Sequence, residues 1–254
     1  MRGLERSCAF ELVPRPGSGR LVSHQRRTRA GDCDTRGLIR LDGIARYMED
    51  VANDDIVDVG LPRGHSWVVR RTHIRVEKAA TIGEMVTCST WCSGLGPAWA
   101  ERRTSIEGER GAEIEAASTW VFIELGSGRP ARLVPQFVDL YAEAAGGRRV
   151  KGRLMHPSPP ADSTRRRWQL RHRDFDVLGH MNNAAYWEVV VDELARRPDI
   201  GPRVWAEVEY RAPIEVGDEV EIQVCESGSS LEVWLSDTQR VYASTVVAAL
   251  EGCT

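Results

Sequence analysis

A short motif occurs twice in this chain, and the repeat limits the fold more than any other feature. The pattern Asp-x-Asp-x-x-Gly stands at residues 32–37 and again at residues 174–179, 142 residues later. In both places a segment with helical periodicity follows, and segments with the alternation of β-strands come after it. We therefore predict a duplicated unit. Only the second copy continues into His180, Asn182 and Asn183, so we expect one half that reacts and one half that shapes a pocket.

The first unit is expected to hold a strand, one long amphipathic helix and four antiparallel strands. The helix is predicted over residues 38–56, where apolar side chains recur at helical spacing. Its polar face carries Arg40, Asp42, Arg46, Glu49 and Asp50. The strands are predicted at 21–29, 67–76, 84–92, 98–106 and 114–125, with Gly-containing turns near 94–97 and 109–111.

The second unit repeats this order with shorter loops. A strand at 168–173 and a helix at 183–196 are predicted to precede strands at 204–211, 219–225, 231–235 and 241–250. A sheet and a helix each need the other to bury an apolar face, so the fold class is α+β, and the two sheets can pair at their edges. The expected division is a loose arm at 1–20, a first domain at 21–128, a linker with a short helix at 129–163 and a second domain at 164–254.

Composition narrows the functional class. The net charge of -3 argues against a dedicated nucleic-acid binder, which is usually basic. No apolar run reaches the ~18–20 residues that span a bilayer, and the N-terminal residues lack the apolar core of a signal peptide. The six cysteines are scattered, with neither a CxxC pair nor a histidine at zinc-ligand spacing. We expect a cytoplasmic protein with reduced cysteines, no metal and no cofactor.

Two stretches resemble a known family, the acyl-acyl-carrier-protein thioesterases of fatty acid synthesis. One comprises Trp67–Lys78, Gly83–Val86 and Thr90–Gly94, and the other is Asp174–Tyr186. The resemblance runs from about His24 to Ala249. It implies a tandem (double) hotdog fold, in which two antiparallel sheets each wrap round a long helix. It also implies hydrolysis of fatty acyl-acyl carrier protein to free fatty acid and carrier protein, with the acyl chain bound in the first half. A homodimer is compatible with this fold.

The chain departs from the plant members of the family at two places. They read Asp-x-Asn-x-His-Val-Asn-Asn, whereas Leu178 stands here at the middle Asn. They also carry Tyr-Arg-x-Glu-Cys on the following strand, whereas this chain continues from Tyr210 and Arg211 to Glu215 without the Cys. A cysteine nucleophile is therefore not expected, and Glu215 is the candidate for the family's Glu. The simpler coenzyme A hotdog enzymes, which read Asp-x-x-Gly-His, are closer to this chain here.

Thioester hydrolysis assigns roles to four residues of the second half. Asp176 can attack the carbonyl directly or act as general base on a water, and we favour the water route. His180 can orient the water or polarise the carbonyl. Amides at the helix N-terminus near Asn182 can hold the oxyanion, and Glu215 completes the set. In the competing interpretation Asp176 is a turn residue and Asn182 a helix cap.

The acyl chain and the carrier protein need surfaces of their own. Apolar residues of the first half could line an acyl slot, or could simply pack the core: Ile44, Tyr47, Met48, Val51, Trp67 and Val69. Carrier protein is acidic, so a basic docking patch is expected, with Arg148, Arg149, Lys151 and Arg153, or Arg165, Arg166 and Arg167, as candidates.

Two other functions fit the same residues. An acyl-coenzyme A thioesterase would use the same chemistry, although the chain has no Gly-rich phosphate loop. A non-catalytic acyl-thioester sensor would explain the departures from the family motif. A sensor usually carries a DNA-binding module, and no helix-turn-helix segment is evident.

Overall fold

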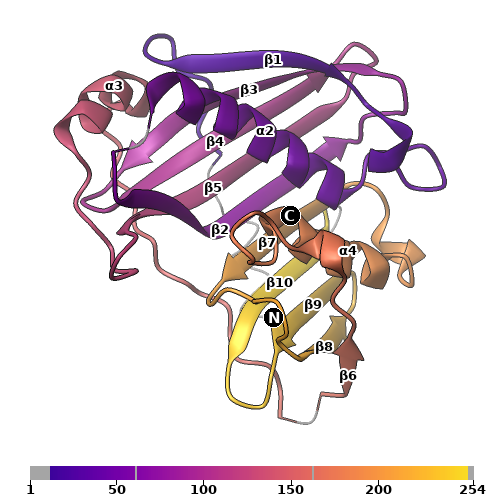
Figure 1. Ribbon diagram of the computed structural model, residues 1–254. Helices are drawn as coiled ribbons and strands as arrows, with labels where there is room; N and C mark the ends of the chain where they lie inside the picture. The colour runs from indigo at the N-terminus through magenta and orange to yellow at the C-terminus, as the bar shows by residue number, and fades with distance from the viewer. Residues whose placement is uncertain (1–11, 61, 162, 251–254) are drawn as a thin grey trace.

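One antiparallel sheet of ten strands runs through the computed structural model, which describes residues 12–60, 62–161 and 163–250 (Figure 1). The first half supplies β1 (Leu21–Arg27), β2 (His65–Lys78), β3 (Met85–Leu95), β4 (Trp99–Gly108) and β5 (Glu113–Glu124). The second half supplies β6 (Arg165–Trp168), β7 (Val204–Tyr210), β8 (Val220–Ser227), β9 (Ser230–Ser236) and β10 (Val241–Ala249). Their order across the sheet is β1-β3-β4-β5-β2-β7-β10-β9-β8-β6.

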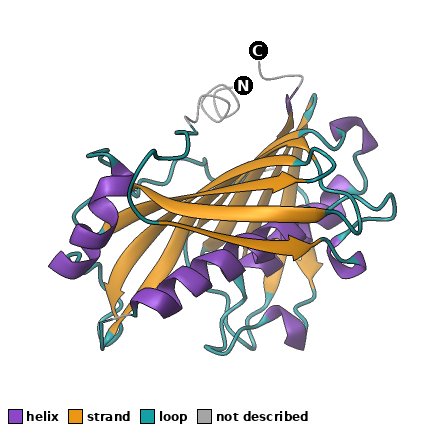
Figure 2. Ribbon diagram, turned by 90° about the horizontal axis from the view of Figure 1, so that it is seen from above, coloured by secondary structure: helices purple, strands orange, loops and turns teal. Residues whose placement is uncertain are grey.

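The two halves join through β2 and β7, which pair antiparallel from Arg71 opposite Glu209 to Val76 opposite Val204. Each half contributes one long helix, α2 (Leu41–Val59) and α4 (Asn183–Leu194), and the two helices contact each other. Both helices lie on the same face of the sheet (Figures 1 and 2). Their buried faces and the inward side chains of the strands form one apolar cluster that extends through both halves. The edge-paired, continuous sheet expected from the repeat is therefore confirmed.

The predicted elements agree with the structure except at two points. The strand predicted at 168–173 lies instead at Arg165–Trp168. Beyond it the Asp174 carboxylate accepts the Arg171 N–H at 2.7 Å, and this bond closes a 3-10 turn where an extended strand was expected. The second difference is on α2, because Asp42 from its polar face is fully buried between Arg40 and Arg46.

The segment between the halves forms a short helix and then a strap. The helix α3 (Pro135–Ala145) packs against β3, and its Tyr141 hydroxyl donates to Asp55 of α2 at 2.7 Å. The strap, residues 146–161, has no helix or strand. It is bonded to the second half by the Trp234 indole N–H, which donates to the Pro157 carbonyl at 3.1 Å, and by the Arg211 guanidinium, which donates to the His156 carbonyl at 2.8 Å.

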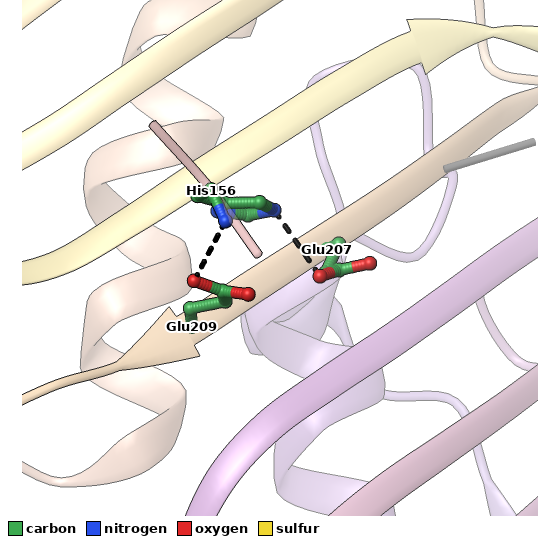
Figure 3. A group of neighbouring side chains, drawn as sticks. All are labelled: His156, Glu207 and Glu209. Carbon is green, nitrogen blue, oxygen red and sulfur yellow. Dashed lines mark hydrogen bonds and ion pairs between the residues drawn. The ribbon is translucent and has the colours of Figure 1, made fainter. Parts of the chain in front are cut away.

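A buried cluster of ionisable side chains ties the strap to the joint between the halves. Figure 3 shows His156 of the strap beside Glu207 and Glu209 of β7. Glu207 of β7 lies directly opposite His73 of β2, and one of its carboxylate oxygens is 2.9 Å from the His73 Nδ1. Its other oxygen lies 3.1 Å from Nε2 of His156 on the strap. Burial opposes ionisation of Glu207, but the two imidazoles outweigh it and hold the pKa of Glu207 well below its usual range. The same burial lowers the pKa of His73, and Glu207 only partly offsets this shift. We call His73, Glu207 and His156 the seam clamp.

Two residues of the seam clamp, His156 and Glu207, also belong to a group with the donor types of a metal site. His156, Glu207 and Glu209 bring a ring nitrogen and two carboxylate oxygens within 4.8 Å of one another. The Glu209 carboxylate, however, already accepts the backbone N–H groups of Met155 and His156 and the Arg211 guanidinium. Because protein donors occupy both carboxylates, we interpret the group as an ion-paired joint.

Glu207→Gln should lower the free energy of unfolding by about 3–5 kcal/mol at pH 7, because it removes the charge that two buried imidazoles face. The stability contributed by Glu207 is present above the unfolded carboxyl pKa of about 4.3 and is lost as pH falls toward its lower folded pKa. The difference between wild type and variant should therefore shrink below about pH 4. Urea unfolding across pH measures it. Glu221→Gln, which breaks an exposed pair with Arg165, is the control and should change stability by less than about 1 kcal/mol.

Candidate active site

The Asp176 carboxylate shapes the loop that leads into α4. Its Oδ1 accepts the backbone N–H groups of Leu178 at 2.8 Å and of His180 at 3.3 Å. The Asp176 N–H donates to the His180 carbonyl at 2.8 Å, and Gly179 has a positive φ of 77° that side chains other than glycine rarely adopt. Asp176 is thus a turn residue whatever its chemical role.

The first copy of the motif folds into the same turn. Asp34 Oδ1 accepts the N–H groups of Arg36 at 2.9 Å and Leu38 at 3.0 Å, and Gly37 also has a φ of 77°. Leu38 occupies the place of His180, so this turn presents no imidazole. The neighbouring Asp32 accepts the Tyr47 hydroxyl at 2.9 Å. The first copy therefore keeps the scaffold of the site and lacks its imidazole.

His180 lies beside Glu215. The two residues form an antiparallel bridge, and the His180 Nε2 is 3.9 Å from the Glu215 Oε1. Both side chains are on the surface, 44% and 64% exposed. Leu178, which replaces the family's Asn, is 70% exposed and contributes only its backbone N–H to the turn. The structure thus brings Asp176, His180 and Glu215 together on one rim.

Asn182 connects this rim to the interior. Its Oδ1 caps α4 by accepting the Ala184 N–H at 2.8 Å, and its Nδ2 donates to Oε2 of Glu49 on α2 at 3.3 Å. Its own N–H donates to the Asp174 carbonyl at 2.8 Å. Among the described residues the next amide, Asn183 N–H, has no hydrogen-bond acceptor, as expected for the first residue of a helix.

A small cavity of about 20 Å³ lies between α2 and the sheet where the two halves meet. Residues of the first half line it together with Asn183, Trp187 and Tyr210 of the second half. A second cavity adjoins it and shares Ala52, Arg102 and Trp120 as lining. A third adjoins the second and shares Trp67 and Phe137. The three cavities follow α2 from Ala45 to Val59, about 20 Å of helix, and we call them the α2 channel.

The structure separates the residues predicted to bind the acyl chain into two groups. Met48, Val69 and Trp67 line the α2 channel. Three others do not: Ile44 faces a cavity beside the first-half turn, Tyr47 bonds Asp32 beneath the Arg26 guanidinium, and Val51 is buried in the core. Asp176 and His180 do not line the channel either. The next residues of the chain connect their loop to the channel: Asn182 bonds Glu49, and Asn183 lines the first cavity.

Sequence reasoning missed Glu49, which was placed on the solvent face of its helix. It lines the channel, and its Oε1 is sealed from solvent without a hydrogen-bond partner among the described residues. Burial raises the pKa of Glu49 to about 7; the Asn182 and Asn183 amides oppose the shift, and the charges of Asp50 and Asp176 add to it. Helical periodicity cannot reveal such burial, because the covering residues come from the other half.

Solved structures share the whole arrangement of a helix wrapped by a sheet, twice in one chain. One is an acyl-ACP thioesterase from Bacteroides thetaiotaomicron, 19% identical, with a TM-score of 0.77 over 90% of this chain and 97% of the other. Another is the 12:0-ACP thioesterase from Umbellularia californica, 16% identical, with a TM-score of 0.76 over 90% and 96%. The fold is therefore the expected double hotdog.

The family follows from sequence models. One for the acyl-ACP thioesterase N-terminal domain matches residues 20–141, and one for the C-terminal domain matches residues 158–244. The chain belongs to the acyl-ACP thioesterase family and is a thioester hydrolase. It is 31% identical over 219 residues to an uncharacterized protein of Mycobacterium tuberculosis, covering 86% of this chain and 88% of that protein. It is also 27% identical over 194 residues to the chloroplastic acyl-[acyl-carrier-protein] hydrolase FATB2 of Cuphea viscosissima, covering 72% and 42%. In the described part of the chain, no helix has both the length and the apolar character needed to cross a membrane.

Proposed function

We propose that this thioesterase releases fatty acids from acyl carrier protein with the acyl chain in the α2 channel and the thioester at the N-terminus of α4. The observation that carries the proposal is that Asn183, three residues after His180, lines the first cavity, and that the channel continues from there along α2. An acyl chain in the channel would bring its carbonyl to the end where the polar residues gather.

The oxyanion has one evident partner in this arrangement. The Asn183 N–H lacks an acceptor among the described residues and stands at the first turn of α4, where the helix dipole favours negative charge. Asn182 keeps this end in place by capping Ala184. A preorganised donor of this kind stabilises the developing charge without reorganisation.

The rim residues act on the thioester from outside the channel. Hydrolysis proceeds by water attack, without a covalent intermediate. Asp176 holds the loop, His180 polarises the thioester or its water, and Glu215 places a carboxylate 3.9 Å from the imidazole, where it favours the protonated ring. This route needs no cysteine nucleophile, so the chain can lack the family's Cys.

Asp176→Ala and His180→Ala should each lower kcat for acyl-ACP hydrolysis by about 10²-fold or more, because the first removes the acceptor that holds the loop and the second removes the imidazole. Release of the carrier-protein thiol measures the rate. Asp34→Ala removes the same two bonds from the equivalent turn of the first half and is the matched control, expected to keep wild-type kcat. Full activity in both second-half variants would contradict the proposed site.

The far end of the channel supplies a basis for chain-length selection. Trp67 and Phe137 stand between the second and third cavities and pack with ring centroids 4.9 Å apart. Burial of each methylene contributes ~0.8 kcal/mol, so an open slot would discriminate lengths only weakly. Two aromatic rings that block the slot can discriminate far more sharply by steric exclusion.

Trp67→Ala should join the second and third cavities and shift the preferred substrate to longer acyl chains, by roughly tenfold in relative kcat/KM for two added carbons. A series of acyl-ACP substrates of increasing length measures the shift. Trp99→Ala, which removes a first-half tryptophan that packs on Gly152 away from the channel, should leave the profile unchanged. If the chain-length profile of the Trp67 variant is unchanged, Trp67 does not form the end of the slot.

Carrier-protein docking is assigned to the strap. Arg149, Lys151 and Arg153 are exposed and form no ion pair with a described residue. The competing run is already neutralised, since Arg165, Arg166 and Arg167 pair with Glu221, Glu193 and Glu219. Arg148 likewise pairs with the buried Glu101. Unpaired cations leave the strap as the stronger attractor for an acidic partner.

Reversal of Arg149, Lys151 and Arg153 to Glu should lower kcat/KM for acyl-ACP by about tenfold at low salt, chiefly through the association rate. The effect should fade at high ionic strength. Acyl-coenzyme A with the same chain is the companion substrate, and its turnover should not change. Wild-type preference for acyl-coenzyme A over acyl-ACP would instead favour the coenzyme A thioesterase.

A further inference from the structure

We propose that Glu49, which the first half contributes, is the general base that activates the hydrolytic water. The proposal rests on the thioesterase site proposed above and adds to it a catalytic residue outside the duplicated motif. Its basis is the position of one carboxylate, between the channel and the two asparagines at the start of α4.

The two oxygens of Glu49 have different surroundings. Oε2 accepts the Asn182 Nδ2 at 3.3 Å, which fixes the carboxylate against the cap of α4. Oε1 is buried and makes no hydrogen bond of good geometry with a described residue, although the Asn183 side-chain amide lies near enough to the carboxylate to favour its charged form. Glu49 lines the same cavity as Asn183, whose N–H is the proposed oxyanion donor. A water between Oε1 and a thioester at Asn183 would therefore have both an acceptor for its proton and an electrophile.

The charges around Glu49 suit a base that works near neutral pH. Asp50 on the same helix and Asp176 on the rim reinforce the effect of burial, which raises the pKa of Glu49 to about 7. Across the cavity, Arg102 of β4 is paired with Asp55 at 2.6 Å. Tyr210 of β7 is neutral, because burial raises the pKa of its hydroxyl. A carboxylate with a pKa near the working pH combines basicity with the correct protonation state.

Asp176 is less suited to this step. Its Oδ1 already accepts two backbone N–H groups, which hold the loop in its turn. Asp34 has the same two bonds in the half that lacks the histidine, so the shared function of the pair is structural. Asp176 is a positioning residue in this scheme.

Comparison of the two halves supports a link between Glu49 and the motif. The residue 142 positions after Glu49 is Val191 of α4, which lines the cavity beside the first-half turn. That cavity has Leu38 and Leu41 where the second half has His180 and Asn183. The turn that kept its histidine faces a helix with a carboxylate, and the turn that lost it faces a helix with valine. The acid and the histidine are retained or absent together.

The reaction balances with these groups alone. Glu49 takes a proton from water as the water oxygen bonds to the thioester carbon, and the carbonyl oxygen becomes an oxyanion at the Asn183 N–H. Collapse of this intermediate breaks the C–S bond. The proton on Glu49 then passes to the sulfur, so that one water and one thioester give one fatty acid and one thiol.

Glu49→Gln tests the proposal, since it keeps the size of the side chain and an oxygen for Asn182. The kcat for acyl-ACP should fall by about 10²–10⁴-fold. The rise of wild-type kcat/KM with pH, centred near 7, should disappear from the residual activity. Glu49→Asp should restore part of the rate. Asp54→Asn, an exposed carboxylate of α2 that pairs with His24, is the matched control and should keep the wild-type rate and profile.

Thermal unfolding separates this role from a structural one. The folded pKa of Glu49 is raised, so its stabilising contribution is present at low pH and is lost as pH rises through about 7. Glu49→Gln should therefore raise Tm by roughly 5 °C at pH 8 and change it little at pH 5. A variant that is more stable at pH 8 yet keeps wild-type kcat and pH profile would overturn the proposal. Loss of stability with loss of activity would also overturn it, because the carboxylate would then be structural. If the wild type hydrolyses neither acyl-ACP nor acyl-coenzyme A, the proposed function itself fails.

Discussion

Pairing of β2 with β7 is the contact on which the rest of the molecule depends. It converts two sheets into one and removes an unpaired edge from each. The seam clamp adds a buried carboxylate on one strand that faces an imidazole from the other strand and another from the strap. Buried charges tolerate little displacement from their partners, so the register between the halves is fixed at this point. That register sets the position of α2 relative to α4.

The candidate site is assembled from both halves and belongs to neither alone. The first half supplies Glu49 and the channel under α2, and the second supplies the turn, the histidine and the start of α4. Asn182 links them with one amide, which caps its own helix through Oδ1 and bonds the other helix through Nδ2. The geometry of the reacting groups therefore depends on how the helices pack.

Local periodicity was sufficient to predict most of the fold. α2, α4 and the central strands have strong apolar patterns, and the repeated motif indicated two similar halves. β6 was misplaced because a side-chain bond from Asp174 ends the extended chain early. Trp67 was predicted to line the slot, whereas Phe137 was not, because it reaches the channel from α3 in the segment taken as linker. The burial of Glu49 was not predicted for a related reason. Residues remote in the sequence bury it, and helical spacing gives no information about them.

The equal turns at Asp34 and Asp176 have a consequence for how such a chain can diverge. If two identical copies of one half assembled, every copy would need the histidine loop and the opposing acid at once, and each mutation would appear twice. A covalent tandem removes this symmetry constraint. One turn can lose its imidazole, and the helix facing it can exchange an acid for valine, while the complementary pair is preserved. The half without the histidine can then accept mutations that adapt its surface to the shape of the ligand. The same hydrogen bonds still hold the backbone of its turn.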